Sequence, residues 1–338
     1  MSVIAPIEQA PAVSVVLPVY NGAAYVQSAV LSILGQSWTD FELIIINDGS
    51  KDASGEIVDA LCDARIRVFH QQNRGLAATL NRGIELARGR YIARQDQDDL
   101  SLPERFARQV AYLDANPDCV LLGTAAEIWV GDHADGRAHD HPTDHAALAF
   151  ELLFNNPFVH SSVMMRRDAV LAVGGYTTDP ARQPPEDYEL WSRLARYGRV
   201  ANLPERLLVY REVPASMSRT GPNPFLTRLV MLCTENLAML VGDEASVGDL
   251  KAIASLTHST EEVPASALPP IKRLCGWVRL AAQRIAQGRP DAALAARVES
   301  HVVTLRHQYA LRRHGLAWAR PILRALRGVA RRVVRARG

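Results

Sequence analysis

The stretch Arg90-Tyr-Ile-Ala-Arg-Gln-Asp-Gln-Asp-Asp99 joins a short apolar run to three carboxylates within four residues. Residues 90–93 predict a buried strand, so the acidic residues fall where that strand ends. Carboxylates this close repel one another unless a cation lies among them. Mg²⁺ and Mn²⁺ take oxygen ligands, usually one or two carboxylates plus substrate phosphates. The alternative is an acidic helix start, since Ser101 and Pro103 follow.

Strands and helices alternate upstream and downstream of this stretch. Apolar runs rich in β-branched residues predict further strands at residues 13–19, 41–46 and 66–69. Helical spacing marks residues 23–34, 51–61, 76–87 and 103–113. Such alternation with continuously apolar strands predicts a parallel sheet covered on both faces. In sheets of this type ligands bind beyond the carboxyl ends of the strands.

Two more polar clusters fall at those carboxyl ends. Tyr20 begins the first, and its ring either stacks on a base or packs against protein. Asp48 lies in the second, Asn-Asp-Gly-Ser, where its carboxylate either accepts a hydrogen bond from a nucleoside or forms a turn and helix cap. Polar clusters after three strands of one sheet indicate a ligand site at one edge.

The pattern changes after residue 120. We expect a strand at 119–130, a His- and Asp-rich loop, a helix near 144–154, strands at 161–165 and 207–210, and a helix at 186–197. Glu186 and Asp187 follow two prolines that restrict how the acids are presented. A positioned carboxylate can deprotonate a hydroxyl, although acids are also common in the first turn of a helix.

Composition limits the class of protein. The chain has 338 residues, 48% apolar and 22% charged, which predicts a globular protein with a large domain and an appendage. Four scattered cysteines without metal-ligand spacing favour a reduced cytosol. We expect no signal peptide and no transmembrane helix. The most apolar candidate, residues 225–241, is interrupted by Arg228, Glu235 and Asn236.

Charge is unevenly distributed along the chain. Residues 301–338 hold ten arginines and no acid, which leaves 28 basic against 36 acidic side chains before them. Apolar residues and arginines in 316–338 fall on opposite faces of a predicted basic amphipathic helix. Such a helix either lies on an anionic membrane surface or packs on the body of the protein. Nucleic acid is the least expected partner, because no aromatic residues interleave the arginines after Trp318.

Seven stretches together resemble glycosyltransferase family 2, whose members have the nucleotide-diphosphosugar transferase (GT-A) fold. They occur in the family's order and spacing across residues 13–211. The matching stretches are residues 15–22, 41–50, 73–77, 89–94, 96–105, 174–176 and 186–191.

The resemblance implies a donor side and a metal. Pro18 and Tyr20 would line a nucleoside pocket, and Asp48 would contact the base, expected to be uracil or thymine. Asp96 would contact the ribose or the metal shell. Asp98 would ligate the divalent metal, Mn²⁺ or Mg²⁺, that bridges the diphosphate.

The resemblance also implies an acceptor side. Asp187 would be the general base, with Glu186 beside it. His160 would shape the acceptor side, or else be a core or capping histidine. Arg211 would lie near the diphosphate. Many relatives carry a histidine two residues later that some use as a metal ligand, and here that position is Val213.

We therefore predict an α/β, Rossmann-like GT-A mixed sheet with a C-terminal helical extension. The expected parts are a loose N-terminus (1–12), the GT-A domain (13–220), a helical extension (221–315) and the basic helix (316–338). The resemblance implies an inverting transferase that moves sugar from a UDP- or dTDP-sugar to a saccharide or lipid-linked acceptor in cell-surface glycan synthesis. It would work in the cytoplasm, peripheral on the inner face of the membrane. The alternatives are a nucleotidyltransferase of related fold and a non-catalytic nucleotide-sugar-binding protein.

Overall fold

The computed structural model describes residues 10–213 and 225–315. They belong to two compact units, one ending at Arg228 and the other beginning at Leu229. The predicted basic helix at 316–338 lies outside the described residues, as do residues 1–9 of the predicted loose N-terminus.

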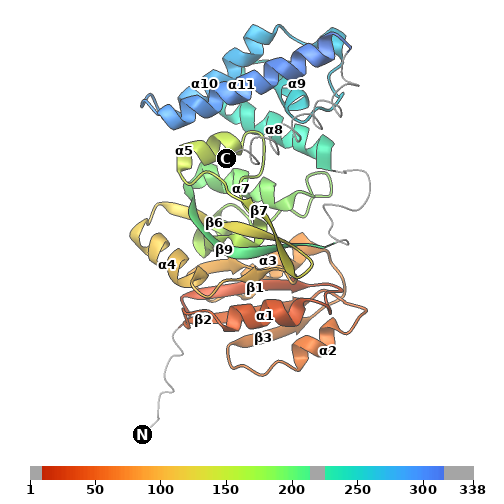
Figure 1. The fold of residues 1–338 in the computed structure, drawn as a ribbon, viewed down its shortest axis with the longest axis vertical. Helices are drawn as coiled ribbons and strands as arrows, with labels where there is room; N and C mark the ends of the chain where they lie inside the picture. Colours follow the sequence, from red (N-terminus) through yellow and green to blue (C-terminus); the bar gives the residue numbers. More distant parts are fainter. Residues whose placement is uncertain (1–9, 214–224, 316–338) are drawn as a thin grey trace. The chain divides into compact units, whose positions relative to one another are not determined.

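The first unit is built on one large sheet (Figure 1) with the strand order β3-β2-β1-β4-β8-β6-β9-β5, and β7 pairs with β6. Its first four strands are parallel: β1 (Val13–Val19), β2 (Phe41–Asn47), β3 (Ile66–His70) and β4 (Tyr91–Arg94). Their carboxyl ends therefore lie along one edge. The parallel strands predicted at 13–19, 41–46, 66–69 and 90–93 are confirmed within a residue.

The other strands make the sheet mixed. They are β5 (Leu100–Ser101), β6 (Cys119–Val130), β7 (His133–His139), β8 (Met164–Arg166) and β9 (Arg199–Glu212). β8 is antiparallel to both β4 and β6, β9 is parallel to β6, and β5 is antiparallel to β9. The predicted mixed α/β class is confirmed.

Helices cover both faces of the parallel strands. Val15 and Leu17 of β1 share a buried cluster with residues of α1 (Val26–Leu34), α2 (Ser54–Asp59) and α4 (Arg105–Ala115). On the other face Gly83 of α3 (Leu76–Leu86) lies so close to β1 that an added Cβ would be 2.3 Å from Val16 Cγ1. Burial on both faces explains why these strands are continuously apolar.

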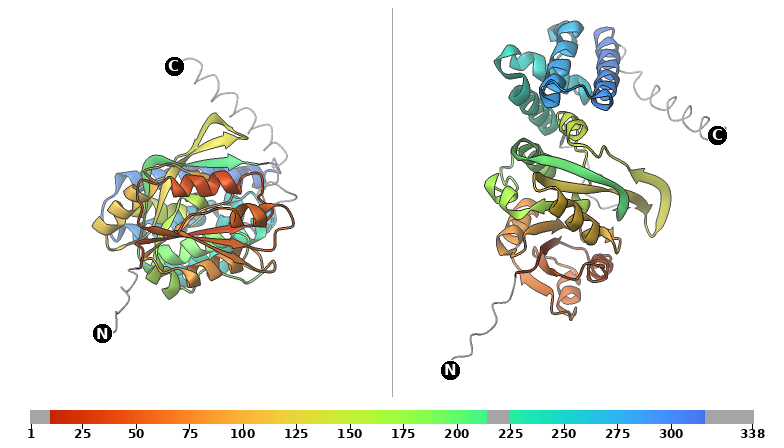
Figure 2. Two further views of the ribbon diagram at one scale, coloured as in Figure 1. Left: turned by 90° about the horizontal axis from the view of Figure 1, so that it is seen from below. Right: turned by 90° about the vertical axis from the view of Figure 1, so that its left-hand side faces the viewer.

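The second half of this unit departs from prediction in three places. A strand, β7, occupies the expected His- and Asp-rich loop; its side chains are mostly exposed, so it lacks an apolar pattern. Figure 2 shows the β6–β7 hairpin extending beyond the sheet. β9 is longer than the predicted 207–210, because Asn202 and Pro204 interrupt its apolar run. Residues 160–162 form a 3₁₀ turn, η1 (His160–Ser162), before β8.

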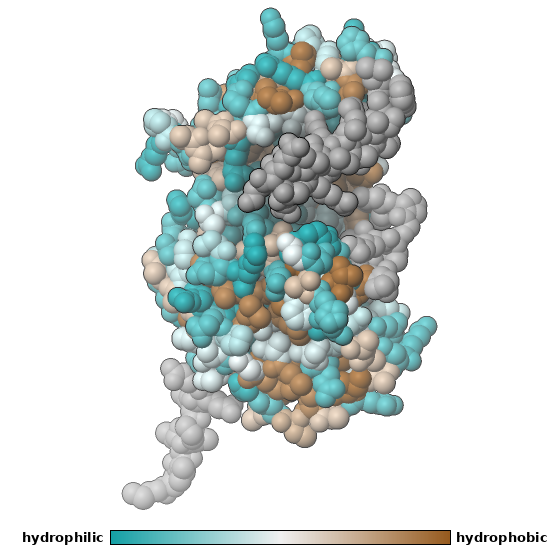
Figure 3. All heavy atoms as spheres, viewed as in Figure 1, coloured by the Kyte–Doolittle hydropathy of each residue, from teal (hydrophilic) through white to brown (hydrophobic). Residues whose placement is uncertain are grey.

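Three further helices complete the unit: α5 (His145–Glu151), α6 (Arg167–Ala172) and α7 (Glu186–Tyr197). The last has the bounds predicted from sequence. On the face in Figure 3, hydrophilic and hydrophobic residues are interspersed over this unit.

The described residues from Phe225 to the end of the second unit form helices. They are α8 (Phe225–Val241), η2 (Gly242–Glu244), α9 (Val247–Thr257), η3 (Ala265–Ala267), α10 (Ile271–Ala286) and α11 (Ala292–Arg313). Asp249 of α9 is buried and accepts hydrogen bonds from Arg273 (2.8 Å) and Trp277 Nε1 (2.9 Å) of α10. Phe225–Glu244 is long and apolar enough to cross a membrane, a criterion that core helices also meet. The sequence prediction had excluded a span there.

Candidate active site

The acidic loop, defined as Asp96–Asp99, connects β4 to β5 at the carboxyl edge of the sheet. One carboxylate oxygen each from Asp96, Asp98 and Asp99 lies within 4.8 Å of the other two. These three acids, which the sequence places within four residues, therefore lie close enough to share one cation.

Hydrogen-bond donors reach the three carboxylates of this loop unequally. Buried Arg94 forms an ion pair with Asp96, and Ser161 Oγ donates to Asp96 Oδ2 at 2.6 Å. Asp99 Oδ1 accepts from the Arg211 N–H at 2.8 Å, whereas the buried Asp99 Oδ2 has no partner among the described residues.

Burial and mutual repulsion change the acidity of these carboxyl groups. Burial, and next the charge of Asp96, raise the pKa of Asp98 to about 6. Burial, followed by Asp96 and Asp98, raises the pKa of Asp99 well above its usual value. A carboxylate cluster with an orphaned buried oxygen fits a hard divalent cation.

Gln95 is hydrogen-bonded to the backbone of the acidic loop, and the sequence predicts no function for it. Its Nε2 donates to the Asp99 carbonyl (2.8 Å) and to the Asp96 carbonyl (3.2 Å). Its Oε1 accepts from Ser101 Oγ (2.8 Å) and Arg105 Nη1 (3.1 Å). The sequence offered one signal of this role: Gln95 is polar at a position where similar proteins frequently have an apolar residue. A polar side chain buried at the end of a strand needs hydrogen-bond partners.

Tyr20 follows β1, and its side chain is largely accessible, with 43% of the residue exposed. The Tyr20 N–H donates to Gln97 Oε1 at 2.9 Å, and Gln97 Nε2 donates to the Tyr20 carbonyl at 3.1 Å. A Cβ on Gly22 would lie 2.3 Å from Gln97 Oε1, so glycine leaves room for this bridge. Pro18 is buried within β1.

Asp48 is buried and organises the loop between β3 and α3. Its Oδ1 accepts from Gln71 Nε2 (2.7 Å) and the Arg74 N–H (2.9 Å), and its Oδ2 accepts from the Gly75 N–H (3.0 Å). The turn that sequence offered as an alternative role for Asp48 uses Asn47 instead, whose Oδ1 accepts from the Ser50 N–H.

Glu186 and Asp187, here called the acidic pair, form the first turn of α7. Asn156 Nδ2 donates to Asp187 Oδ2 at 2.7 Å, and the Tyr188 N–H donates to Asp187 Oδ1 at 2.7 Å. Burial, and next Asp187, raise the pKa of Glu186 to about 7. Burial also raises the pKa of Asp187, and the Tyr188 N–H, Arg94 and Asn156 oppose that rise.

His160 lies in an aromatic cluster next to this pair. Its Nε2 is 2.8 Å from the Tyr176 hydroxyl oxygen, and its ring centroid is 5.7 Å from that of Trp191. Burial, and then Arg94, lower the pKa of His160 well below its usual value, so the ring is neutral. These contacts are those of a core histidine; the acceptor-side role stays a prediction.

Arg211 contacts the acidic loop from β9. Besides its backbone bond to Asp99, its Nη1 donates to Ser28 Oγ (3.2 Å) and the Asp98 carbonyl (3.4 Å). The guanidinium lies 5.4 Å from the centroid of the Tyr25 ring. Val213, at the position of the missing histidine, is buried.

Arg94 links the acidic loop to the acidic pair. Its charge lowers the pKa of both Asp98 and Asp187, and Asp96 in turn raises the pKa of Glu186. The two groups of acids are thus within electrostatic reach of each other. Asp48 joins the same edge, because its N–H donates to the Val19 carbonyl at 2.8 Å, next to Tyr20.

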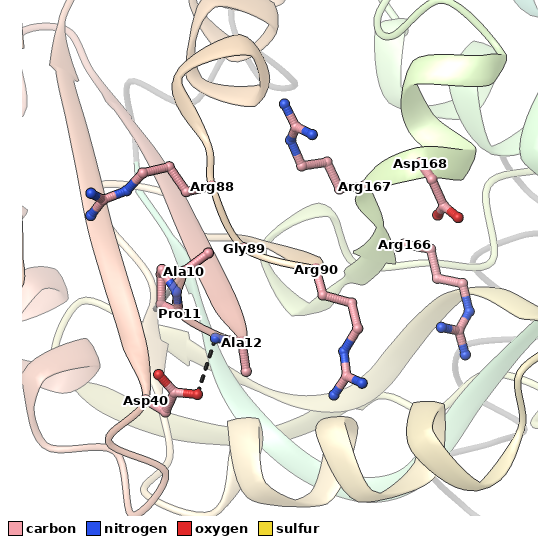
Figure 4. Close-up of a pocket in the computed structure, with 10 residues that line it drawn as sticks. All are labelled: Ala10, Pro11, Ala12, Asp40, Arg88, Gly89, Arg90, Arg166, Arg167 and Asp168. Carbon is pink, nitrogen blue, oxygen red and sulfur yellow. Dashed lines mark hydrogen bonds between the residues drawn. The ribbon is translucent and has the colours of Figure 1, made fainter. Parts of the chain in front are cut away.

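A cavity of about 740 Å³ lies at the opposite edge of the sheet, where β1 and β4 begin. Figure 4 shows that the guanidinium groups of Arg88, Arg90 and Arg167 point in different directions. Arg88 pairs with Glu42 (3.0 Å) and Arg90 with Asp114 (2.8 Å). This cavity lacks the convergent acids of the carboxyl edge.

Comparison with known proteins agrees with this geometry. The sequence model of Glycosyl transferase family 2 matches residues 14–174. The putative glycosyltransferase EpsE of Bacillus subtilis is 34% identical over 207 residues, which cover 60% of this chain and 73% of EpsE. The amylovoran biosynthesis glycosyltransferase AmsE of Erwinia amylovora is 32% identical, covering 59% of this chain and 75% of AmsE.

Solved structures share the fold at low identity. S. aureus TarS 1–349 in complex with UDP-GlcNAc superposes with a TM-score of 0.61 and 14% identity, covering 91% of each chain. The mixed sheet thus has the GT-A fold, and the sequence relatives define the class of protein as a glycosyltransferase. The chain belongs to glycosyl transferase family 2.

Proposed function

We propose that the chain transfers a sugar, with inversion, from a nucleotide-diphosphate donor to a hydroxyl of a saccharide or lipid-linked acceptor in cell-surface polysaccharide synthesis. The observation that carries the proposal is that two acid groups, the acidic loop and the acidic pair, both interact with buried Arg94.

The names of similar proteins support the substrate class. AmsE is an amylovoran biosynthesis glycosyltransferase, and WbnJ of Escherichia coli, 32% identical over 207 residues, is an O-antigen biosynthesis glycosyltransferase. TarS was crystallised with UDP-GlcNAc. We expect a UDP- or dTDP-sugar for this chain.

Asp98, with Asp96 and Asp99, would hold Mn²⁺ or Mg²⁺. The unpaired Asp99 Oδ2 and the pKa of Asp98, raised by burial and by the charge of Asp96, support this assignment, because a cation would bind the free oxygen and offset the repulsion between the acids. When bound, such a metal neutralises charge on the leaving diphosphate. PcManGT of Pyrobaculum calidifontis, with a TM-score of 0.50, is described in complex with GDP-Man and Mn²⁺.

Asp187 would accept the proton of the attacking hydroxyl. Each of its oxygens already accepts one hydrogen bond, which fixes the carboxylate and leaves lone pairs for a further proton. One base is sufficient, because inversion by direct displacement needs no covalent intermediate.

Tyr20 and Pro18 would line the nucleoside pocket, and Arg211 would lie beside the diphosphate. Asp48 Oδ2 accepts one hydrogen bond from the loop that it organises, so a second lone pair remains for a base N–H.

A thermal-shift screen of nucleotide-diphosphate sugars tests the donor and the metal together. Ligand stabilisation follows the logarithm of concentration over Kd, so the preferred donor should raise Tm most, and only when Mn²⁺ is present. Equal shifts with Mn²⁺ and with EDTA would refute the metal assignment, and no shift with any donor would refute the donor class.

We also propose a cytoplasmic enzyme peripheral on the inner membrane face, attached through residues 316–338. Deletion of these residues should abolish sedimentation with vesicles rich in phosphatidylglycerol, while neutral vesicles bind neither form. Unchanged sedimentation after deletion would contradict attachment through the tail.

A further inference from the structure

Asn156 lies in the turn between α5 and η1, and both ends of its side-chain amide are in use. The Phe158 N–H donates to Asn156 Oδ1 at 3.1 Å, and Asn156 Nδ2 donates to Asp187 Oδ2 at 2.7 Å. Because the backbone N–H must meet an acceptor, it fixes which end of the amide faces Asp187. The neighbouring Pro157 carbonyl accepts from Asn202 Nδ2 at 3.1 Å, which anchors the turn.

An amide NH₂ held in this way can only donate. A donor on a carboxylate favours the charged form, so Asn156 acts on Asp187 in the same direction as the Tyr188 N–H. The Glu186 carboxylate accepts a hydrogen bond from its own backbone N–H. The two adjacent acids therefore differ in their donors: Asp187 accepts a side-chain hydrogen bond from Asn156, and Glu186 does not.

We propose that Asn156 is a positioning residue of the transfer reaction: its amide, fixed by the Phe158 N–H, holds Asp187 as an oriented carboxylate, while the adjacent Glu186, to which Asn156 does not donate, is the acid that takes up a proton. This inference rests on the proposed role of Asp187 as the base. It adds a division of labour within the acidic pair, in which Asp187 is ready to accept a proton and Glu186 is not.

The surroundings of Asp187 agree with this division. The charged and titratable groups that act on it or respond to it are Glu186 on α7, Arg94 at the end of β4, and Tyr176, which is bonded to His160. Arg94 is a fixed cation and Tyr176 is protonated. Burial, and then the charges of Asp187 and Asp96, raise the pKa of Glu186 to about 7. Acid pairs driven apart by their environments commonly mark separate roles.

Two variants of Asn156 distinguish its hydrogen bond to Asp187 from its part in the fold of the turn. Asn156→Asp keeps an acceptor for the Phe158 N–H but places a second carboxylate against Asp187. Asn156→Ala removes both bonds. Asn155 is the matched control, since it is the adjacent residue, of the same type, and exposed. Asn155→Asp and Asn155→Ala are made alongside.

The assay measures UDP release from UDP-GlcNAc with Mn²⁺ and water as acceptor across pH 5–9, together with UDP affinity. We expect both Asn156 variants to lower kcat about 10- to 100-fold, the rate equivalent of losing a hydrogen bond to a charged group. Their acid limb should move to higher pH by about one unit or more, because Asp187 has lost a donor to its charged form. UDP affinity and the Asn155 variants should stay within about twofold of the unmodified chain.

An unshifted acid limb in Asn156→Asp, a loss of UDP affinity that accounts for the loss in rate, or unfolding of both Asn156 variants would overturn the proposal. Asp187→Asn in the same assay tests the proposed base separately. If Asp187→Asn keeps full turnover, or the unmodified chain releases no UDP, both the proposed base role of Asp187 and the proposed role of Asn156 are wrong. If it is inactive while the Asn156 variants match the Asn155 controls, only the inference about Asn156 is wrong.

Discussion

The acidic loop and the acidic pair are within electrostatic reach of each other and are both rich in carboxylates, yet they differ in what surrounds each oxygen. Asp99 Oδ2 in the loop has no partner among the described residues, and Asp98 titrates near pH 6. In the pair, each oxygen of Asp187 accepts a hydrogen bond. A cluster short of donors is suited to a cation, whereas a carboxylate fixed by donors is suited to take a proton.

The largest expected effect is that of a substitution in the acidic pair. Asp187→Asn should lower turnover by about 10²–10⁴-fold, the usual contribution of a general base, with the donor Kd unchanged. Steady-state kinetics and calorimetric titration of UDP with Mn²⁺ measure the two quantities. Asp118→Asn is the control, because that side chain is 64% exposed and pairs only with exposed Arg199 at 3.5 Å. Near-normal turnover would remove Asp187 from the base role.

A smaller effect tests the loop. Asp98→Asn should lose the Mn²⁺-dependent part of donor stabilisation, which is about 2.7 kcal/mol when the ligand is at one hundred times its Kd. Thermal unfolding with UDP, with and without Mn²⁺, measures that part as a difference in Tm. Equal Mn²⁺-dependent shifts in Asp98→Asn and the unmodified chain would show that Asp98 is not a ligand.

The smallest effect concerns pH and Glu186. Its pKa is raised from 4.5 to about 7 in the fold, so the stability it contributes is fully present below about pH 4.5 and is lost as pH rises through 7. Glu186→Gln removes this titration. Between pH 5 and 8 the unmodified chain should therefore lose several degrees of Tm relative to the variant. Parallel curves of Tm against pH would show that Glu186 does not titrate in this range.

Sequence predicted the acidic loop better than the surroundings of the acidic pair, and the reason is local. The strand and carboxylates at 90–99 are contiguous, so one stretch reveals both. Asn156 is 31 residues from the acid to which it donates, and no periodicity connects them. The polar β7 and the interrupted β9 were missed for a related cause: strand prediction needs an apolar pattern, and neither strand keeps one along its length.

Helix α7 was predicted to the residue, because two prolines precede it, acids fill its first turn and Gly198 follows it. Gln97 carried no such signal, and Gln95 carried only that of a polar residue at a position where an apolar one is frequent. Their importance comes from buried carbonyls and a neighbouring backbone that only the fold brings to them.

The paired hydrogen bonds between Gln97 and the backbone of Tyr20 couple the residue expected to meet the nucleobase to the loop expected to meet the cation. A ligand that displaces Tyr20 must also displace that loop or break both bonds. We therefore expect nucleotide and cation to bind cooperatively, and thermodynamic reciprocity requires each to tighten the other by the same factor. Shortening Gln97 would remove this contribution to the coupling and leave the contribution made by the cation and the diphosphate themselves.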